Sequence, residues 1–206
     1  DLRIRKMYDT VGEYKVTYYA IDGDKNLLVQ ERVIKVASKT KFVEKVGDVE
    51  ENDVPIRVEN IRTSNKVLHP TGVIAYHRDP DGKIHEQPAL FENTIDRGNA
   101  GMQKANFTNT HHYDILPGTN GRKRPADTAS KTYLIHGNIV FEDVDDAVYF
   151  MDTEVDLLEN VHAMFKQAFE DGSVKETNAD ITTSYPDNKL TVESPQKVVV
   201  EYTATD

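Results

Sequence analysis

The chain has 206 residues, with 25 Lys and Arg against 35 Asp and Glu, and its formal net charge is −10. This acidic balance disfavours nucleic acid as a partner and favours cations, basic surfaces or neutral sugars. The absence of cysteine excludes disulfides, thiolate metal sites and a catalytic cysteine.

A β-hairpin is predicted near the start of the chain. Residues 14–22, YKVTYYAID, alternate β-branched or aromatic residues with a period of two, which is typical of a strand. The turn residues 22–26, DGDKN, end this strand. Residues 27–36 then return as a second strand that is apolar at Leu28, Val33, Ile34 and Val36.

This hairpin carries a family resemblance. The run VGEYKVTYYAIDGDKN followed by RVIKV resembles the last two strands of the bacterial Ig-like domains that are repeated in Gram-positive surface and S-layer-type proteins. The family pattern Gly-x-Tyr-x-Val-x-Tyr-x-Ala-x-Asp is matched from Gly12 to Asp22, whereas the turn departs from it at residues 24–26. The match covers residues 11–36 and, in part, residues 198–206. It implies Ig-like β-sandwich elements on a cell surface, and it implies little about chemistry.

Short strands and a long loop are predicted in the middle of the chain. Strand composition occurs at residues 42–46, 54–61, 73–78 and 83–86, and the turn DPDG at 79–82 predicts a second hairpin. Residues 92–130 lose all periodicity, so we expect an irregular loop, which at this length is usually functional. Strand composition returns at residues 131–136, 138–141 and 147–151.

One amphipathic α-helix is predicted at about residues 153–171. Its apolar residues recur at steps of three and four, and Gly172 is placed to end it. The stripe consists of Val155, Leu158, Val161, Phe165, Ala168 and Phe169. Three short strands follow at residues 180–185, 189–192 and 197–203. The predicted class is therefore mainly β, with Ig-like β-sandwich elements and one helix.

The last nine residues, 198–206 (VVVEYTATD), resemble residues 14–22. Alternation in any half-buried strand explains part of this likeness, and a tandem repeat explains the shared Ala and Asp as well. On the repeat hypothesis, residues 1–37 are the C-terminal strands of one Ig-like sandwich. Residues 38–206 are then a second β-rich domain that lacks its last strand. Since the sequence begins at Asp1 and shows no signal peptide, we expect a mature product or a cut fragment.

An isolated hairpin buries too little apolar surface to be stable. We therefore expect the hairpin to be completed by strand addition, either from the C-terminal half of the same chain or from a neighbouring copy.

The acidic run at residues 142–146 is the candidate metal site. Glu142, Asp143, Asp145 and Asp146 place four carboxylates within five residues, and hard cations prefer oxygen ligands. Calcium is the expected cofactor if a metal binds there; the alternative is a solvated acidic surface. A zinc site would require His77 and His85 to meet across the second hairpin.

The long loop supplies the candidate ligand or interface residues, which are Phe91, Phe107, Tyr113, Arg122, Lys123 and Arg124. Its basic residues precede an acidic segment, 132–165, that contains no Lys or Arg. Either the two segments dock on each other, within the chain or between copies, or both are solvated surfaces.

No nucleophile elbow, phosphate loop or dinucleotide fingerprint occurs, so we expect no enzymatic activity. No apolar run approaches the ~20 residues of a membrane span, so we expect no membrane insertion. The expected function is a structural or assembly module of an extracellular, cell-surface protein. The alternative is an adhesin-type module that binds a carbohydrate or a host protein through residues 92–130.

Overall fold

The computed structural model describes residues 10–45, 47, 52–109 and 127–206. The chain divides into two compact units, each built from several segments. The first unit contains residues 1–57, 69–94 and 105–131, and the second contains residues 58–68, 95–104 and 132–206. The boundary that the sequence suggests, between residues 37 and 38, lies inside the first unit and stays a prediction.

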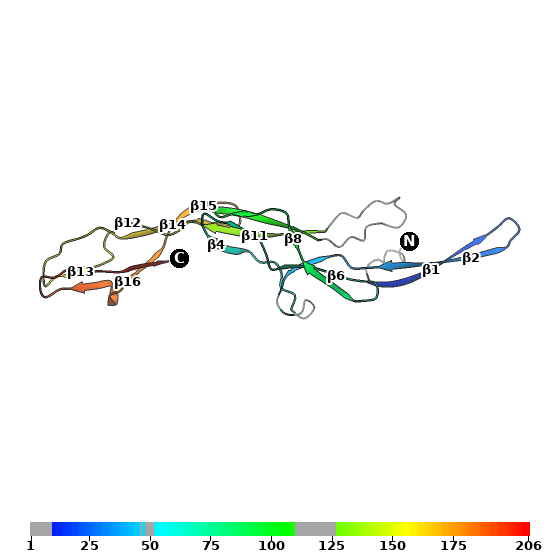
Figure 1. The fold of residues 1–206 in the computed structure, drawn as a ribbon, viewed down its shortest axis with the longest axis horizontal. Helices are drawn as coiled ribbons and strands as arrows, with labels where there is room; N and C mark the ends of the chain where they lie inside the picture. Colours follow the sequence, from blue (N-terminus) through cyan, green and yellow to red (C-terminus); the bar gives the residue numbers. More distant parts are fainter. Residues whose placement is uncertain (1–9, 46, 48–51, 110–126) are drawn as a thin grey trace. The chain divides into compact units, whose positions relative to one another are not determined.

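The first unit begins with the predicted hairpin. Strands β1 (Gly12–Ile21) and β2 (Leu27–Val36) pair antiparallel over their whole length, with Tyr19 opposite Val29 (Figure 1). The turn is stabilised by the Asp22 carboxylate, which accepts hydrogen bonds from the backbone N–H groups of Asp24 and Asn26. The sequence prediction of this hairpin is confirmed.

A three-stranded antiparallel sheet forms the core of the first unit. Its strands are β3 (Lys41–Glu44), β6 (Val73–Arg78) and β7 (Ile84–Pro88), in the order β3-β6-β7. Val43, Ile74 and Tyr76 are buried together, with Ile84 packed against them. The β6–β7 pair is the predicted second hairpin, and Asp79 N–H donates to Lys83 O at its turn.

The mixed sheet has the order β4-β11-β10-β8. Its strands are β4 (Glu59–Arg62), β8 (Leu90–Phe91), β10 (Gly101–Thr108) and β11 (Thr128–His136). Strand β11 runs parallel to β4, with Ile135 opposite Ile61. Strands β5 (Val67–Leu68) and β9 (Ile95–Asp96) form a separate two-stranded pair.

The remaining sheets belong to the second unit. Strands β12 (Val140–Glu142), β14 (His162–Ala168) and β15 (Val174–Asn178) form one antiparallel sheet. Strand β13 (Glu154–Asp156) pairs with β17 (Lys189–Thr191), and β16 (Asp180–Thr183) pairs with β18 (Tyr202–Thr205). A 3₁₀ turn, η1, spans Pro186–Asn188.

The predicted helix at residues 153–171 is wrong, since β13 and β14 lie there instead. Asn160 has a φ of 63°, and Val161 N–H bonds to Leu158 O, so a turn interrupts the segment. After the turn, Ala163 and Phe165 point inward with a period of two, and β12 and β15 pair with the strand on either side. Gly172, with a φ of 85°, serves the β14–β15 hairpin turn rather than a helix end.

The prediction of an irregular loop at residues 92–130 is also wrong in part. Residues 101–108 form β10, in which Ala105 and Phe107 are buried while Lys104 and Asn106 are exposed. Because several residues of β10 are polar or small, the sequence of this segment lacks the apolar alternation that indicates a strand. The protein is thus mainly β, as predicted, whereas an Ig-like sandwich remains a proposal.

The buried residues of β11 after residue 131 belong to the second unit and should contribute strongly to its stability. Ile135 in β11 is 0% exposed. Ile135→Ala should lower the free energy of unfolding by about 2–5 kcal/mol, because a large buried side chain leaves a cavity. Urea unfolding measures this loss. Val174→Ala, at an exposed position of β15, is the control and should cost less than about 0.5 kcal/mol; equal losses would contradict the assignment of the core.

Candidate functional site

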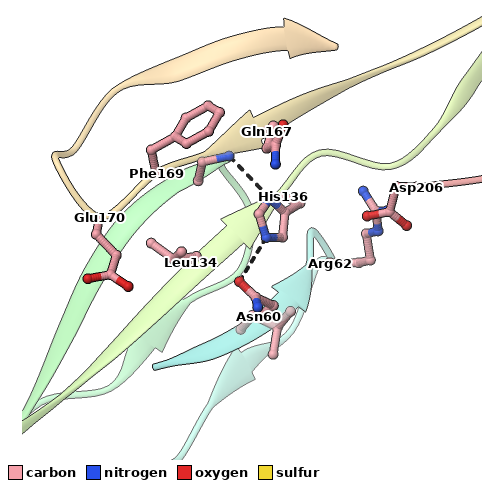
Figure 2. Close-up of a pocket in the computed structure, with 10 residues that line it drawn as sticks. Asn60, Arg62, Leu134, His136, Gln167, Phe169, Glu170 and Asp206 are labelled. Carbon is pink, nitrogen blue, oxygen red and sulfur yellow. Dashed lines mark hydrogen bonds and ion pairs between the residues drawn. The ribbon is translucent and has the colours of Figure 1, made fainter. Parts of the chain in front are cut away.

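The described residues offer two candidate sites, a polar pocket in the second unit and the bare surface of the β1–β2 hairpin. The pocket has a volume of about 490 Å³ (Figure 2). Strands β4, β11 and β14 supply most of its lining. The lining residues are Asn60, Ile61, Arg62, Leu134, His136, Gln167, Ala168, Phe169, Glu170 and Asp206.

His136 is held at the centre of the pocket by two hydrogen bonds (Figure 2). The backbone N–H of Ala168 donates to its Nδ1 at 3.1 Å. The proton therefore lies on Nε2, which donates to Asn60 Oδ1 at 3.1 Å. Burial lowers the pKa of His136, the charge of Arg62 lowers it further, and Asp206 offsets part of the effect. The neutral imidazole is thus the form that fits this site.

Arg62 is fully engaged by its surroundings. Its Nη1 donates to Gly137 O at 2.7 Å, and its guanidinium forms an ion pair with Asp206. The guanidinium also lies over the ring of Phe165, at 4.8 Å from the ring centroid. Asp206 therefore balances the positive charge of Arg62. The contacts of the Arg62 side chain also connect β4 to Phe165 in β14 and to Gly137, which follows β11.

The polar side chains of the pocket join strands to one another, since His136 of β11 is hydrogen-bonded to both β4 and β14. Its lining residues include no Ser, Thr, Tyr, Lys or Cys side chain that could act as a nucleophile. Both nitrogen atoms of its histidine are used to hold β4 and β14. Asn60, Gln167 and Glu170 leave the hollow polar, so it can take water or a small polar molecule.

The acidic residues proposed for calcium lie at the end of β12 and in the segment after it. Glu142, Asp143, Asp145 and Asp146 are all exposed. Among the residues that the structure describes, no three His, Asp or Glu side chains are grouped so as to hold a metal ion. Calcium stays a prediction.

His77 and His85 do meet across the second hairpin. They are register partners in β6 and β7, and their rings stack at 5.4 Å between centroids. The Asp79 carboxylate lies between them, 3.2 Å from His77 Nε2 and in an ion-pair contact with His85. The carboxylate thus joins the two strands next to their turn.

The structure separates the residues proposed for ligand binding. Phe91 is exposed and lies against the ring of His69, with the ring centroids 5.8 Å apart. Phe107 is only 1% exposed, so its ring packs inside the first unit and offers no surface to a ligand. Tyr113, Arg122, Lys123 and Arg124 lie outside the described residues.

The β1–β2 hairpin exposes an apolar surface. Two cross-strand pairs, Tyr19 with Val29 and Ile21 with Leu27, lie on one face near the turn. We call these four residues the hairpin patch; Tyr19 is 69% exposed and Ile21 is 71% exposed. The opposite face exposes Tyr18 and Leu28. Within the described residues β1 pairs only with β2, so each strand also has one bare edge.

The sequence predicted the hairpin and missed the pocket. Alternation and turn residues are local patterns, and they placed the hairpin correctly, whereas the exposure of its apolar side chains is known from the structure alone. Asn60 and His136 are hydrogen-bonded although 76 positions separate them. No local sequence pattern predicts a contact between residues so far apart.

The sequence matches no known protein-family model and no curated protein. In the part of the chain that is described, no helix is long and apolar enough to cross a membrane.

The lowered pKa of His136 predicts that the folded state becomes less stable as the pH is lowered. In the unfolded chain His136 takes up a proton near its ordinary pKa of 6.5, whereas the folded state resists protonation. The free energy of unfolding should therefore decrease as the pH falls through about 6.5. Urea unfolding at pH 7.5 and 5.5 measures the difference.

His136→Gln should reduce this pH dependence, because glutamine does not titrate. The exposed residue His162 provides the control, and His162→Gln should keep the profile of the parent chain. If the free energy of unfolding of the His136→Gln variant depends on pH as it does in the parent chain, His136 is not the cause of that dependence.

Proposed function

We propose that the chain is a non-catalytic assembly module of a bacterial cell-surface protein, and that neighbouring copies join by strand addition at the β1–β2 hairpin. The hairpin has two bare edges and two faces with exposed apolar side chains within the described residues. A two-stranded hairpin is at best marginally stable in water by itself. Additional strands would stabilise it by pairing its backbone and by covering the hairpin patch.

The likeness between β1 and β18 is the observation that carries the proposal. In β18, Ser184 N–H donates to Glu201 O, so the odd-numbered residues of that strand direct their backbone groups toward β16. The aligned residues of β1 are Thr17, Tyr19 and Ile21.

These three residues of β1 direct their backbone groups away from β2. Asp22 N–H donates to Asn26 O, so the even-numbered residues of β1 are the ones bonded to β2. The edge that β16 occupies on β18 is therefore bare on β1 within the described residues. Strand β18 in the second unit thus has β16 on this edge, whereas the matching edge of β1 in the first unit has no partner strand among the described residues.

Four charged residues of the hairpin are paired with one another, which favours a partner that binds through backbone hydrogen bonds and apolar contacts. Lys15 pairs with Glu31, and Lys35 pairs with Glu13, so these four charges largely cancel. The hairpin patch itself carries no charge. A second copy of the chain supplies further β-strands of the same kind, and the Ig-like resemblance of residues 11–36 is consistent with repeated surface modules.

The adhesin alternative receives less support from the described residues. It needs exposed aromatic side chains beside residues 92–130, and Phe107 is buried. Phe91 is the aromatic candidate that is both described and exposed.

Self-association tests the proposal. Ile21→Asp places a charge in the hairpin patch and should weaken association about tenfold or more, since burying a charge without a partner is costly. Light scattering or sedimentation equilibrium over a range of concentrations measures the change.

Gly23→Asp provides a matched control in the same hairpin. It adds the same charge, and a Cβ at residue 23 would meet no atom within 4 Å, so this variant should associate like the parent chain. A parent chain that stays monomeric at every concentration would refute the proposal.

A further inference from the structure

The segment between β12 and β13 is apolar and exposed. Residues 147–151, AVYFM, have the composition of a strand, and the sequence predicts one there. The structure forms none at that place (Figure 1). Val148 is 98% exposed and Phe150 is 89% exposed.

Up to residue 151 the backbone of this segment is also unpaired among the described residues, whereas the Asp152 N–H donates to Val192 O at 3.0 Å. Within the described residues, no backbone N–H or C=O group of residues 144–151 bonds to another backbone group outside its own neighbours. One side-chain contact is present, from Thr153 Oγ1 to Met151 O at 3.4 Å. An apolar run with open backbone groups is suited to pairing with a sheet edge.

Charge and apolarity are ordered along the segment. Asp143, Asp145 and Asp146 come first, and the apolar residues 147–151 follow. We call residues 143–151 the donor segment. Strand β2 has the reverse order at the facing positions, because its apolar residues 27–29 come first and its basic residues, Arg32 and Lys35, follow among Glu31 and further apolar residues. Two of these charges are already paired with β1, Glu31 with Lys15 and Lys35 with Glu13, so Arg32 carries the charge argument. Antiparallel pairing of the two would set acid against base and apolar against apolar.

The outer edge of β2 can be assigned from the turn. Because Asp22 and Asn26 form a hydrogen-bonded pair, the even-numbered residues of β2 direct their N–H and C=O groups to β1. The odd-numbered residues, such as Val29 and Val33, direct theirs outward. These outward groups have no strand partner within the described residues.

We propose that the donor segment of one copy adds as an antiparallel strand to the outer edge of β2 in a second copy, with Val148 opposite Gln30. This register also sets Phe150 opposite Leu28, whose side chain is exposed in the single chain. It sets Asp146 opposite Arg32, in a non-hydrogen-bonded pair where side chains approach most closely. The inference rests on the proposed function, since it names what one edge of the hairpin binds.

The contact joins different surfaces of two copies. The donor segment belongs to the second unit, and β2 belongs to the first. If each copy donates to a different neighbour, such a contact is heterologous and builds rings or open filaments, whereas two copies that exchange donor segments form a closed two-fold dimer.

Disulfide trapping tests the register, and the parent chain has no cysteine to interfere. A mixture of Gln30→Cys and Val148→Cys chains should form a mixed dimer under mild oxidation. Non-hydrogen-bonded partners in an antiparallel pair have Cα atoms about 4.5 Å apart, a separation that a disulfide spans. Mass spectrometry distinguishes the mixed dimer from the two homodimers.

The matched control mixes Gln30→Cys with Tyr149→Cys, whose side chain would project from the opposite face. The yield of its mixed dimer should be about tenfold lower. Equal yields, or no mixed dimer in either mixture, would overturn the register. A Gln30→Cys/Val148→Cys double variant that oxidises only within one chain would overturn the contact between copies.

Charge reversal gives a second test. Arg32→Asp and Asp146→Arg should each weaken association about tenfold, because each sets like charges opposite one another. The double variant carries both reversals and should recover most of the loss, since every contact again joins opposite charges. An additive loss in the double variant would overturn the pairing.

The two proposals fail in different ways. Association that Ile21→Asp weakens but that Val148→Asp/Phe150→Asp leaves unchanged would refute the donor segment and leave the hairpin as a docking surface. Association that neither variant affects would refute both.

Discussion

The pairing of backbone groups at strand edges is the constraint on which this structure depends. The described residues form small sheets of two to four strands, and each strand must satisfy its N–H and C=O groups on both sides or leave them to water. Most strands in both units lie beside a partner from a distant part of the sequence. Among the described residues, the β1–β2 hairpin is a two-stranded sheet whose strands follow one another in the sequence, and neither strand has a second partner. Its edges and its patch are therefore where we propose that further strands add.

The same constraint applies to the proposed assembly surface. Within the donor segment, Asp143, Asp145 and Asp146 precede the apolar residues 147–151, and charges beside an apolar strand oppose unspecific pairing. In the proposed pairing they also favour a partner with basic residues at the matching positions. On β2 those positions are Arg32 and Lys35, and Lys35 is also paired with Glu13 within the hairpin. The proposal thus gives a second explanation, strand recognition, for acidic residues that suggest a metal site in the sequence.

The pocket of the second unit illustrates the opposite case, in which polar groups are satisfied inside the chain. His136 accepts from β14 and donates to β4, while Arg62 is bound by a carbonyl, a carboxylate and an aromatic ring. These interactions hold short strands together where the sheets are too small to supply a large apolar core. In this pocket the polar side chains join β4, β11 and β14, and the surface that we propose for assembly lies on the hairpin.

The sequence by itself determined the features whose causes are local. Alternation over residues 14–21 and the turn at Asp22 fixed the first hairpin, and the turn at residues 79–82 fixed the second. The tertiary structure decided the rest. Residues 162–168 have spacings that suit both a helix and a strand, and their strand state depends on β12 and β15 beside them. Strand β10 was hidden by its polar outer residues. The pocket joins residues from separate segments, because a hydrogen bond between Asn60 and His136 depends on where β4 and β11 pair and on nothing near either residue in the chain.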